Sequence, residues 1–297
     1  MSRKVDPKVD CVFKAILGAE ANTNLLIHFL NAVLRPPEAE RITAVELLNP
    51  FKDKEYEEDK LSIVDVSARD KAGRVFQIEI QLHGIGSLVP RIVYNFCDLV
   101  ASQLKDGENY RLLRPVIAIW ILNGVLIQGS TSPHHTFCLY DAGHGVTLDP
   151  RYQIHTLELP RWEKAPVVEE LDRWVWFLRH GDEVDPGGPL PEVLNTPEMR
   201  QAMGVLKQIS EKEQDYRAYQ ARMNFLRQQS GWIEEAEEAR KLLDEQRKVT
   251  EEAFKAAEEA RQETAEAHRR EAQAREENER LRKLLESVKL PPDESGL

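Results

Sequence analysis

Residues 61–83 alternate between apolar and polar positions in two runs that are separated by a short polar loop. Alternation with a period of two is typical of strands that bury one face. In the second run the apolar positions are Phe76, Ile78, Ile80 and Leu82. The loop between the runs, residues 71–73, ends on Gly73, which suits a type I turn closed by a left-handed residue and a bulge. The pattern therefore predicts a β-hairpin.

The turn determines which residues face each other across this hairpin. A loop at residues 71–73 pairs Asp70 with Arg74, Ser67 with Gln77, and Asp65 with Glu79. Opposed side chains have Cβ atoms roughly 4.5–5.5 Å apart, a separation at which two carboxylates repel each other. Asp65, Glu79 and Gln81 would share one face, where a divalent cation such as Mg²⁺ would neutralise the acids. The alternative is the solvated face of a half-exposed sheet, with water between the acids and Arg69 or Arg74 nearby.

The rest of the chain up to residue 229 predicts helices and further strands. Helical periodicity indicates helices at residues 10–17, 22–34, 87–104, 167–179 and 197–229. Apolar or alternating runs indicate strands at residues 42–48, 115–122, 136–140 and 152–159. Helices packed against a mixed sheet that includes an antiparallel hairpin make an α/β fold the expected class.

The last segment has a different pattern. Residues 234–287 are rich in Glu, Ala and Arg and contain no Gly or Pro, which predicts one long helix. Counting in sevens from Ala239 gives a seam that is apolar at its two ends and polar in the middle, with Leu242, Val249, Leu281 and Leu284 among its positions. Such a seam favours a self-associating coiled coil and hence a homo-oligomer. The alternative is a single solvated helix held by charge pairs four residues apart.

Composition limits the possible functions without selecting one. The chain has 297 residues, of which 41% are hydrophobic and 31% charged, so that part of it is expected to lie outside a packed core. Residues 230–297 hold 19 acidic and 13 basic residues, a net −6 within the total of −11. This acidic balance argues against a broad nucleic-acid footprint and leaves room for a local basic groove.

Cysteine and histidine positions bear on the compartment and on metals. The cysteines Cys11, Cys97 and Cys138 lie among apolar residues and have no paired spacing, which favours three buried thiols in a reduced, cytoplasmic protein. No apolar run approaches the length of a membrane span, and the first residues lack the apolar run of a signal peptide. His134, His135, Cys138 and His144 lie close together, but their spacing matches no structural-zinc pattern.

A series of spaced motifs resembles one family. The motifs are Asp10-x-x-Phe13-Lys14, Phe29-Leu30-Asn31, Asp65, Ile78-Glu79-Ile80-Gln81, Arg91-x-x-Tyr94, Gly107-Glu108-x-Tyr110 and Pro115-Val116-Ile117. Over about residues 4–160 they resemble the Rpn family, recombination-promoting nucleases or putative transposases of the PD-(D/E)XK nuclease superfamily. The resemblance implies a restriction-endonuclease-like mixed sheet flanked by helices. It makes a metal site the favoured interpretation of the hairpin.

The resemblance also implies roles for individual residues. Asp65 and Glu79 match the two metal-binding acids, and the backbone carbonyl of Ile80 would be a further ligand. Gln81 occupies the place usually held by a lysine, so that it would orient the attacking water by hydrogen bonding alone. Asp10 would add an auxiliary carboxylate, or else act as the N-cap of the first helix.

Arg91 and Tyr94, three residues apart on one predicted helix, would contact DNA phosphate, or else pack and form a surface salt bridge. The expected function is a Mg²⁺-dependent DNA endonuclease linked to recombination or foreign DNA, with DNA as partner and Mg²⁺ or another divalent cation as cofactor. The alternative is an inactive nuclease-like scaffold that acts through coiled-coil assembly. The expected division is a nuclease-like domain at 1–165, a helical extension at 166–229, a charged helix at 230–290 and a disordered tail at 291–297.

Overall fold

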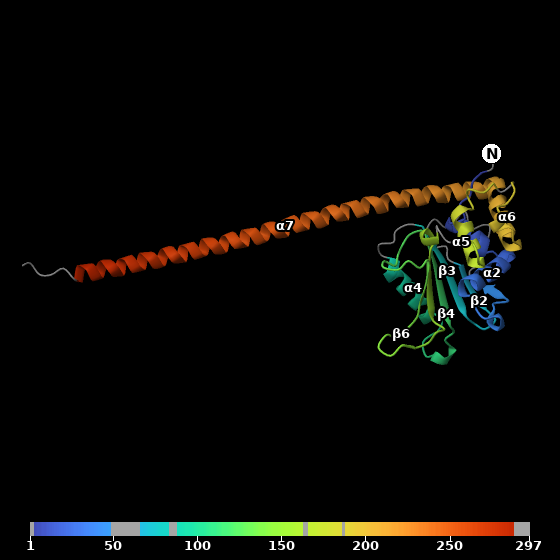
Figure 1. Ribbon diagram of the computed structural model, residues 1–297, viewed down its shortest axis with the longest axis horizontal. Coiled ribbons are helices and arrows are strands. Elements are labelled where there is room, and N and C mark those ends of the chain that lie inside the picture. Colours follow the sequence, from blue (N-terminus) through green and yellow to red (C-terminus); the bar gives the residue numbers. More distant parts are fainter. Residues whose placement is uncertain (1–2, 49–65, 83–87, 163–165, 186–187, 288–297) are drawn as a thin grey trace, which may run out of the picture. The chain divides into compact units, whose positions relative to one another are not determined.

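The computed structural model describes residues 3–48, 66–82, 88–162, 166–185 and 188–287. The chain divides after Gly231 into two units, Met1–Gly231 and Trp232–Leu297. The first unit contains a six-stranded mixed sheet covered by helices, and the second holds the greater part of the long helix α7 (Glu213–Ser287) (Figure 1). The predicted α/β class, with a mixed sheet, flanking helices and a long C-terminal helix, is confirmed.

The strands of the main sheet follow the order β1-β2-β3-β4-β8-β5. They are β1 (Val45–Leu47), β2 (Val66–Asp70), β3 (Val75–Gln81), β4 (Val116–Leu122), β8 (Gln153–Glu158) and β5 (His134–Phe137). β3, β4 and β8 are parallel to one another, and the remaining neighbours are antiparallel. Every residue of β4 is buried, as expected for an apolar strand in the middle of a sheet. A separate small hairpin pairs β6 (Tyr140–Asp141) with β7 (Val146–Thr147).

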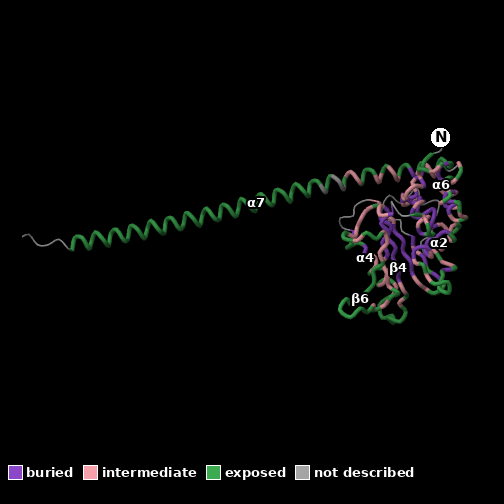
Figure 2. Tube along the Cα trace, viewed as in Figure 1, coloured by how far each residue is buried: buried purple, intermediate pink, exposed green. Residues whose placement is uncertain are grey.

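Helices cover both faces of the sheet (Figures 1 and 2). One face carries α1 (Asp10–Leu17), α2 (Thr23–Leu34), α5 (Glu170–His180) and α6 (Pro197–Glu211), and the other carries α4 (Leu88–Ala101). Short 3₁₀ turns lie at Glu20–Asn22, Glu38–Glu40, Tyr110–Leu112, Leu159–Trp162 and Glu192–Leu194.

The two faces of β4 contribute to two separate apolar clusters. On the first face Ile119 packs with Phe29 of α2 and Trp174 of α5, all of them buried. On the second face Trp120 packs with Leu88 and Ile92 of α4. Alternation along β4 therefore assigns each strand residue to a face, and residues paired with Trp120 lie under α4.

The structure corrects three sequence-based expectations about elements and burial. The helix predicted at 197–229 is two helices, because Lys212 is extended (φ −77°, ψ 118°) between α6 and α7. No Gly or Pro marks this break in the sequence, so the pattern of apolar residues alone predicted one uninterrupted helix. The strand predicted at 42–48 is only Val45–Leu47. All three cysteines are free thiols, but Cys97 and Cys138 are exposed rather than buried.

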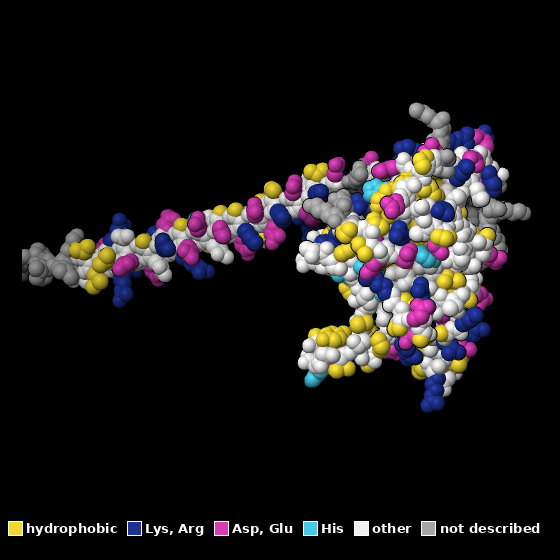
Figure 3. Space-filling model, turned by 45° about the vertical axis from the view of Figure 1, so that its right-hand side comes forward, with side chains coloured by type: hydrophobic (Ala, Val, Ile, Leu, Met, Phe, Trp, Pro, Cys, Tyr) yellow, Lys and Arg dark blue, Asp and Glu magenta, His cyan; other side chains and the backbone are white. Residues whose placement is uncertain are grey.

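The part of α7 in the second unit is a solvated helix with mixed charge. Figure 2 shows its surface as exposed, and Figure 3 shows acidic and basic side chains interspersed along it. Ion pairs four residues apart include Arg275 with Glu271 at 2.7 Å and Lys283 with Glu279 at 3.3 Å. Among the described residues no helix is both long and apolar enough to cross a membrane. The segment at 291–297, expected to be disordered, lies outside the described residues.

Candidate active site

The β2–β3 hairpin forms in the predicted register. Ser67 pairs with Gln77 and Val66 with Ile78, while Gly73 adopts the left-handed conformation with φ 83°. A residue with a Cβ is strained at that angle, so Gly73 sets the turn and with it the strand pairing. Asp65, which this register would place opposite Glu79, lies outside the described residues.

Glu79 lies under helix α4 and away from solvent. It pairs with Trp120 of β4, on the face that α4 covers, and only 3% of its side chain is exposed. Gln77 on the same face is also buried. The alternative of a solvated sheet face is therefore wrong at these positions, because α4 excludes the water that would separate the charges. Arg74, the cation suggested for that role, binds Asp70 at 2.6 Å instead.

Two side chains of α4 hold the carboxylate of Glu79. Arg91 donates through Nη2 to Glu79 Oε2 at 3.2 Å, and Asn95 donates through Nδ2 to Glu79 Oε1 at 3.0 Å. Arg91 and Asn95 are four residues apart, so they lie on the same side of the helix. Burying a carboxylate is costly unless it is paired and hydrogen-bonded, and both conditions are met here.

Gln81 shares the same arginine. Arg91 Nη2 also donates to Gln81 Oε1 at 2.9 Å, and the guanidinium carbon lies 5.2 Å from the centre of the Trp120 ring. The carboxylate oxygen of Glu79 and the amide oxygen of Gln81 therefore converge on one positively charged nitrogen. Two hard oxygen atoms directed at a single cation are a donor set suited to Mg²⁺.

The described residues offer two oxygen donors at this position, fewer than a complete metal site needs. Among them no group of three or more His, Cys, Asp and Glu side chains is close enough to hold a metal ion. Glu79 and Gln81 contribute one carboxylate and one amide oxygen, and Mg²⁺ is often held by one or two carboxylates with the remaining positions filled by water and phosphate. The donors fit such an ion, with Asp65 and the Ile80 carbonyl as the further ligands expected from the sequence.

Asp10 is engaged elsewhere in the first unit. It is the first residue of α1, whose N-cap is Val9, so the expectation that Asp10 is the N-cap is wrong by one position. Both of its carboxylate oxygens accept hydrogen bonds from Arg222 of α7, and Oδ1 also accepts from the backbone N–H of Cys11. Burial opposes the charge of Arg222, but the hydrogen bonds and attraction from Asp10 outweigh it and raise the pKa of Arg222.

Arg91 and Tyr94, expected to act together, point to different surroundings. Arg91 reaches inward to Glu79 and Gln81, whereas Tyr94 is 71% exposed. The salt bridge expected as the alternative for Arg91 exists, but with the buried site acid rather than on the surface.

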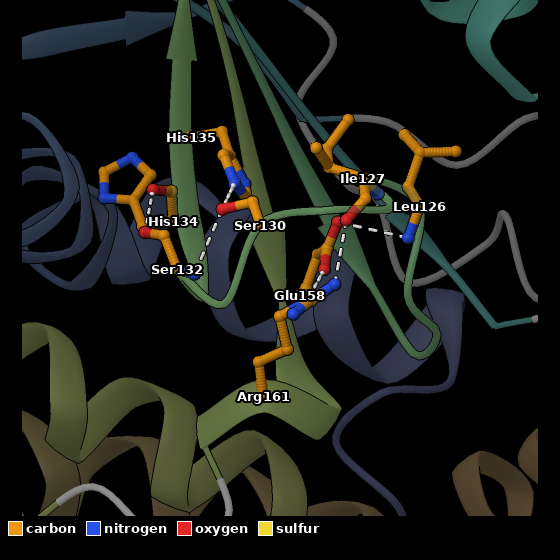
Figure 4. A network of polar contacts seen from close by, with 8 residues as sticks. All are labelled: Leu126, Ile127, Ser130, Ser132, His134, His135, Glu158 and Arg161. Carbon is orange, nitrogen blue, oxygen red and sulfur yellow. Dashed lines mark hydrogen bonds and ion pairs between the residues drawn. The ribbon is translucent and has the colours of Figure 1, made fainter.

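Glu158, which no motif indicated, organises the loop after β4 (Figure 4). It is fully buried at the end of β8, and its Oε1 accepts the backbone N–H groups of Leu126 and Ile127 at 3.1 and 2.8 Å. Arg161 binds its other oxygen and donates to the Ile127 carbonyl at 2.8 Å. Glu158 pairs with Leu122, which in turn pairs with Gln81. Glu158 therefore anchors the loop at the level of the sheet where Gln81 lies. With both oxygens engaged, Glu158 has a structural role.

A histidine pair, with His155 buried and His134 partly buried, occupies the β5–β8 edge. His134 Nε2 lies 2.9 Å from His155 Nδ1, and His155 Nε2 lies 2.9 Å from Gln153 Oε1. Burial, with a smaller contribution from Arg35, lowers the pKa of His134 to about 4. Burial, with a smaller contribution from His134, lowers the pKa of His155 to about 4. The two imidazoles are neutral at pH 7 and hydrogen-bonded to each other, with His155 in the core and His134 at its edge.

A family profile matches most of the chain. The profile of the PD-(D/E)XK nuclease family transposases matches residues 7–236. The chain belongs to this family, which includes the Rpn family proteins. No curated protein and no solved structure matches the chain. The matched region extends beyond the resemblance at about residues 4–160 and includes α5, α6 and the start of α7.

Proposed function

We propose that the chain is a divalent-metal-dependent DNA endonuclease linked to recombination or to foreign DNA. The convergence of the Glu79 and Gln81 oxygens on one cationic position carries this proposal. Membership of a nuclease family supports it, because PD-(D/E)XK nucleases typically use a divalent metal. DNA is the substrate that such an activity requires. The three free cysteines support a reducing, cytoplasmic location as part of the same proposal.

The proposed roles follow from the chemistry of each side chain. Glu79 and Asp65 would hold the cation, with the Ile80 carbonyl as a further ligand. A bound Mg²⁺ would polarise the scissile phosphate and lower the pKa of a water molecule. Gln81, a neutral amide, would orient that water by hydrogen bonding, since it has no proton to exchange at neutral pH. Asp10 remains a proposed auxiliary acid, and using it would require its separation from Arg222.

Plasmid nicking in the presence of Mg²⁺ tests the proposal. Glu79→Gln keeps the size and the hydrogen-bonding capacity of the side chain but removes the charge, and we expect it to abolish cleavage. Asp65→Asn is expected to have the same effect. Asp149→Asn changes a partly exposed acid that pairs with Arg151 instead of Arg91, and it should cleave like the wild type. Cleavage that persists in both site variants would show that the site is assigned wrongly.

A second candidate function is a scaffold that assembles through α7. The observation in its favour is the exposure of heptad residues in the second unit: Leu242, Val249, Leu281 and Leu284 are each more than half exposed. Large apolar side chains that recur on one helix are a signature of helix–helix association. A chain that shows no cleavage with any divalent cation, yet forms oligomers, would favour this function over the first.

A further inference from the structure

Arg91 occupies the position where the oxygen atoms of the proposed metal site converge. Its Nη2 lies 2.9 Å from Gln81 Oε1 and 3.2 Å from Glu79 Oε2. The side chain of Glu79 is 3% exposed, whereas that of Arg91 is 42% exposed. The acid is therefore fixed in the sheet, and its cationic partner has solvent on one side.

A divalent cation that binds both of these oxygens would occupy the position now held by Arg91 Nη2. Mg²⁺ binds oxygen at roughly 2.0–2.1 Å, well inside the N···O distances seen for Arg91, so the oxygens would have to close around the metal. Two cations in contact with one buried carboxylate also repel each other strongly, because solvent screening is weak there. A metal bound to both oxygens therefore requires the guanidinium to leave this position.

The surroundings of Glu79 keep it in place when Arg91 departs. Asn95 holds the other carboxylate oxygen at 3.0 Å, and it carries no charge that would oppose a metal. Glu79 lies on a strand paired on both sides, with β2 and with β4. Arg91 comes from a helix and reaches the site across the Trp120 ring. The acid is the rigid member of the pair, and the arginine is the member that can move.

We propose that Arg91 is a displaceable counter-ion that balances the charge of Glu79 until a divalent cation replaces it. On replacement the guanidinium turns to the solvent side of α4, where it binds a phosphate of the DNA backbone. The metal and the substrate contact are thereby coupled through one side chain. This inference rests on the proposed function, because it concerns the same metal site.

Divalent-cation affinity measured without DNA tests the competition. Mn²⁺ is titrated into the full chain by isothermal titration calorimetry, for the wild type and for Arg91→Gln. Removing a unit charge within a few ångström of the metal, discounted for the partial exposure of Arg91, should tighten binding by roughly tenfold or more. Arg74→Gln is the matched control, since Arg74 pairs with the equally buried Asp70 on the same sheet. It should bind Mn²⁺ like the wild type.

The outcomes separate this inference from the proposed function. If Glu79→Gln loses Mn²⁺ binding but Arg91→Gln binds as the wild type does, or more weakly, the counter-ion role is wrong and the metal site stands. If Glu79→Gln binds Mn²⁺ as the wild type does, the metal site itself is wrong.

A second measurement uses the wild-type protein and does not depend on the folding of Arg91→Gln. With ¹⁵N-arginine labelling, the Nε–H signal of Arg91 is assigned by its absence from Arg91→Lys and is followed during a Mg²⁺ titration. Its chemical shift should move towards that of a solvated guanidinium. A signal that stays unchanged at saturating Mg²⁺ would overturn the proposal.

Discussion

The stability of the first unit is expected to fall in mildly acidic solution because of the His134–His155 pair. Because His155 Nε2 faces the Gln153 carbonyl oxygen, we assign its proton to Nε2, which leaves Nδ1 to accept from His134 Nε2. A second proton on His155 would go to Nδ1 and break that bond. A second proton on His134 would be repelled by the positive charge of Arg35. That repulsion is the second cause of the lowered pKa of His134, burial being the first.

The sign and size of the effect follow from the pKa values. Both folded-state pKa values are about 4, below the usual value of 6.5. Between about pH 4 and pH 6.5 the unfolded chain therefore binds more protons than the folded chain does. The stability that this difference provides is complete above about pH 6.5 and is lost as the pH falls towards about 4. Between about pH 7.5 and pH 5, the buried His155 accounts for a loss of about 2 kcal/mol in the free energy of unfolding, and the partly exposed His134 for a smaller loss because solvent screens its charge.

Urea unfolding at the two pH values, followed by tryptophan fluorescence, measures this loss. Trp120 and Trp174 are buried in the first unit and report on its core. We expect His155→Gln to reduce the difference in unfolding free energy between the two pH values by about 2 kcal/mol relative to the wild type. His144→Gln changes an exposed histidine and should leave the difference unaltered. An equal pH dependence in the wild type and in His155→Gln would refute the reasoning.

Three further predictions concern other parts of the chain. Asp10→Ala should lower the free energy of unfolding by about 2–3 kcal/mol, since it leaves the half-buried Arg222 without its carboxylate, and urea unfolding should show a similar loss for Arg222→Ala. Glu158→Ala should cost about 3–5 kcal/mol and make the Leu126 amide exchange faster with deuterium, and an unchanged exchange rate would contradict the role assigned to Glu158. Val249→Glu should dissociate any oligomer formed through α7 in sedimentation velocity, and an unaltered sedimentation coefficient would exclude Val249 from the contact.

The hairpin and its register were predictable because local rules determine them. Gly73 specifies the turn, and alternation with a period of two assigns each side chain to a face. The same reasoning placed Glu79 and Gln81 side by side. It could not show that α4 buries Glu79, because burial depends on which helix packs on which face, and that is a long-range property of the fold.

Arg91 illustrates the same limit. Helical periodicity places Leu88 and Ile92 inward and leaves Arg91 at the edge of the buried stripe, where either solvent or the sheet is within reach of a long side chain. The partner of Asp10 was equally hidden, since Arg222 is 212 residues away in sequence. Exposure of Cys97 and Cys138 was missed because apolar neighbours in sequence do not guarantee burial in space.

The contacts between the N-terminal segment and the start of α7 constrain how the protein folds during synthesis. Arg3 binds Glu213 at 2.5 Å, the backbone N–H of Asp6 donates to Tyr219 at 3.1 Å, and Asp10 pairs with Arg222. Each contact joins residues more than 200 positions apart, so the N-terminal segment cannot acquire all of these partners until residue 222 has left the ribosome. Translation proceeds at about 5–20 residues per second, so the N-terminal segment waits roughly ten seconds or longer for them. A nascent chain stopped after β8 would hold the complete sheet and still lack the segment that anchors its first helix.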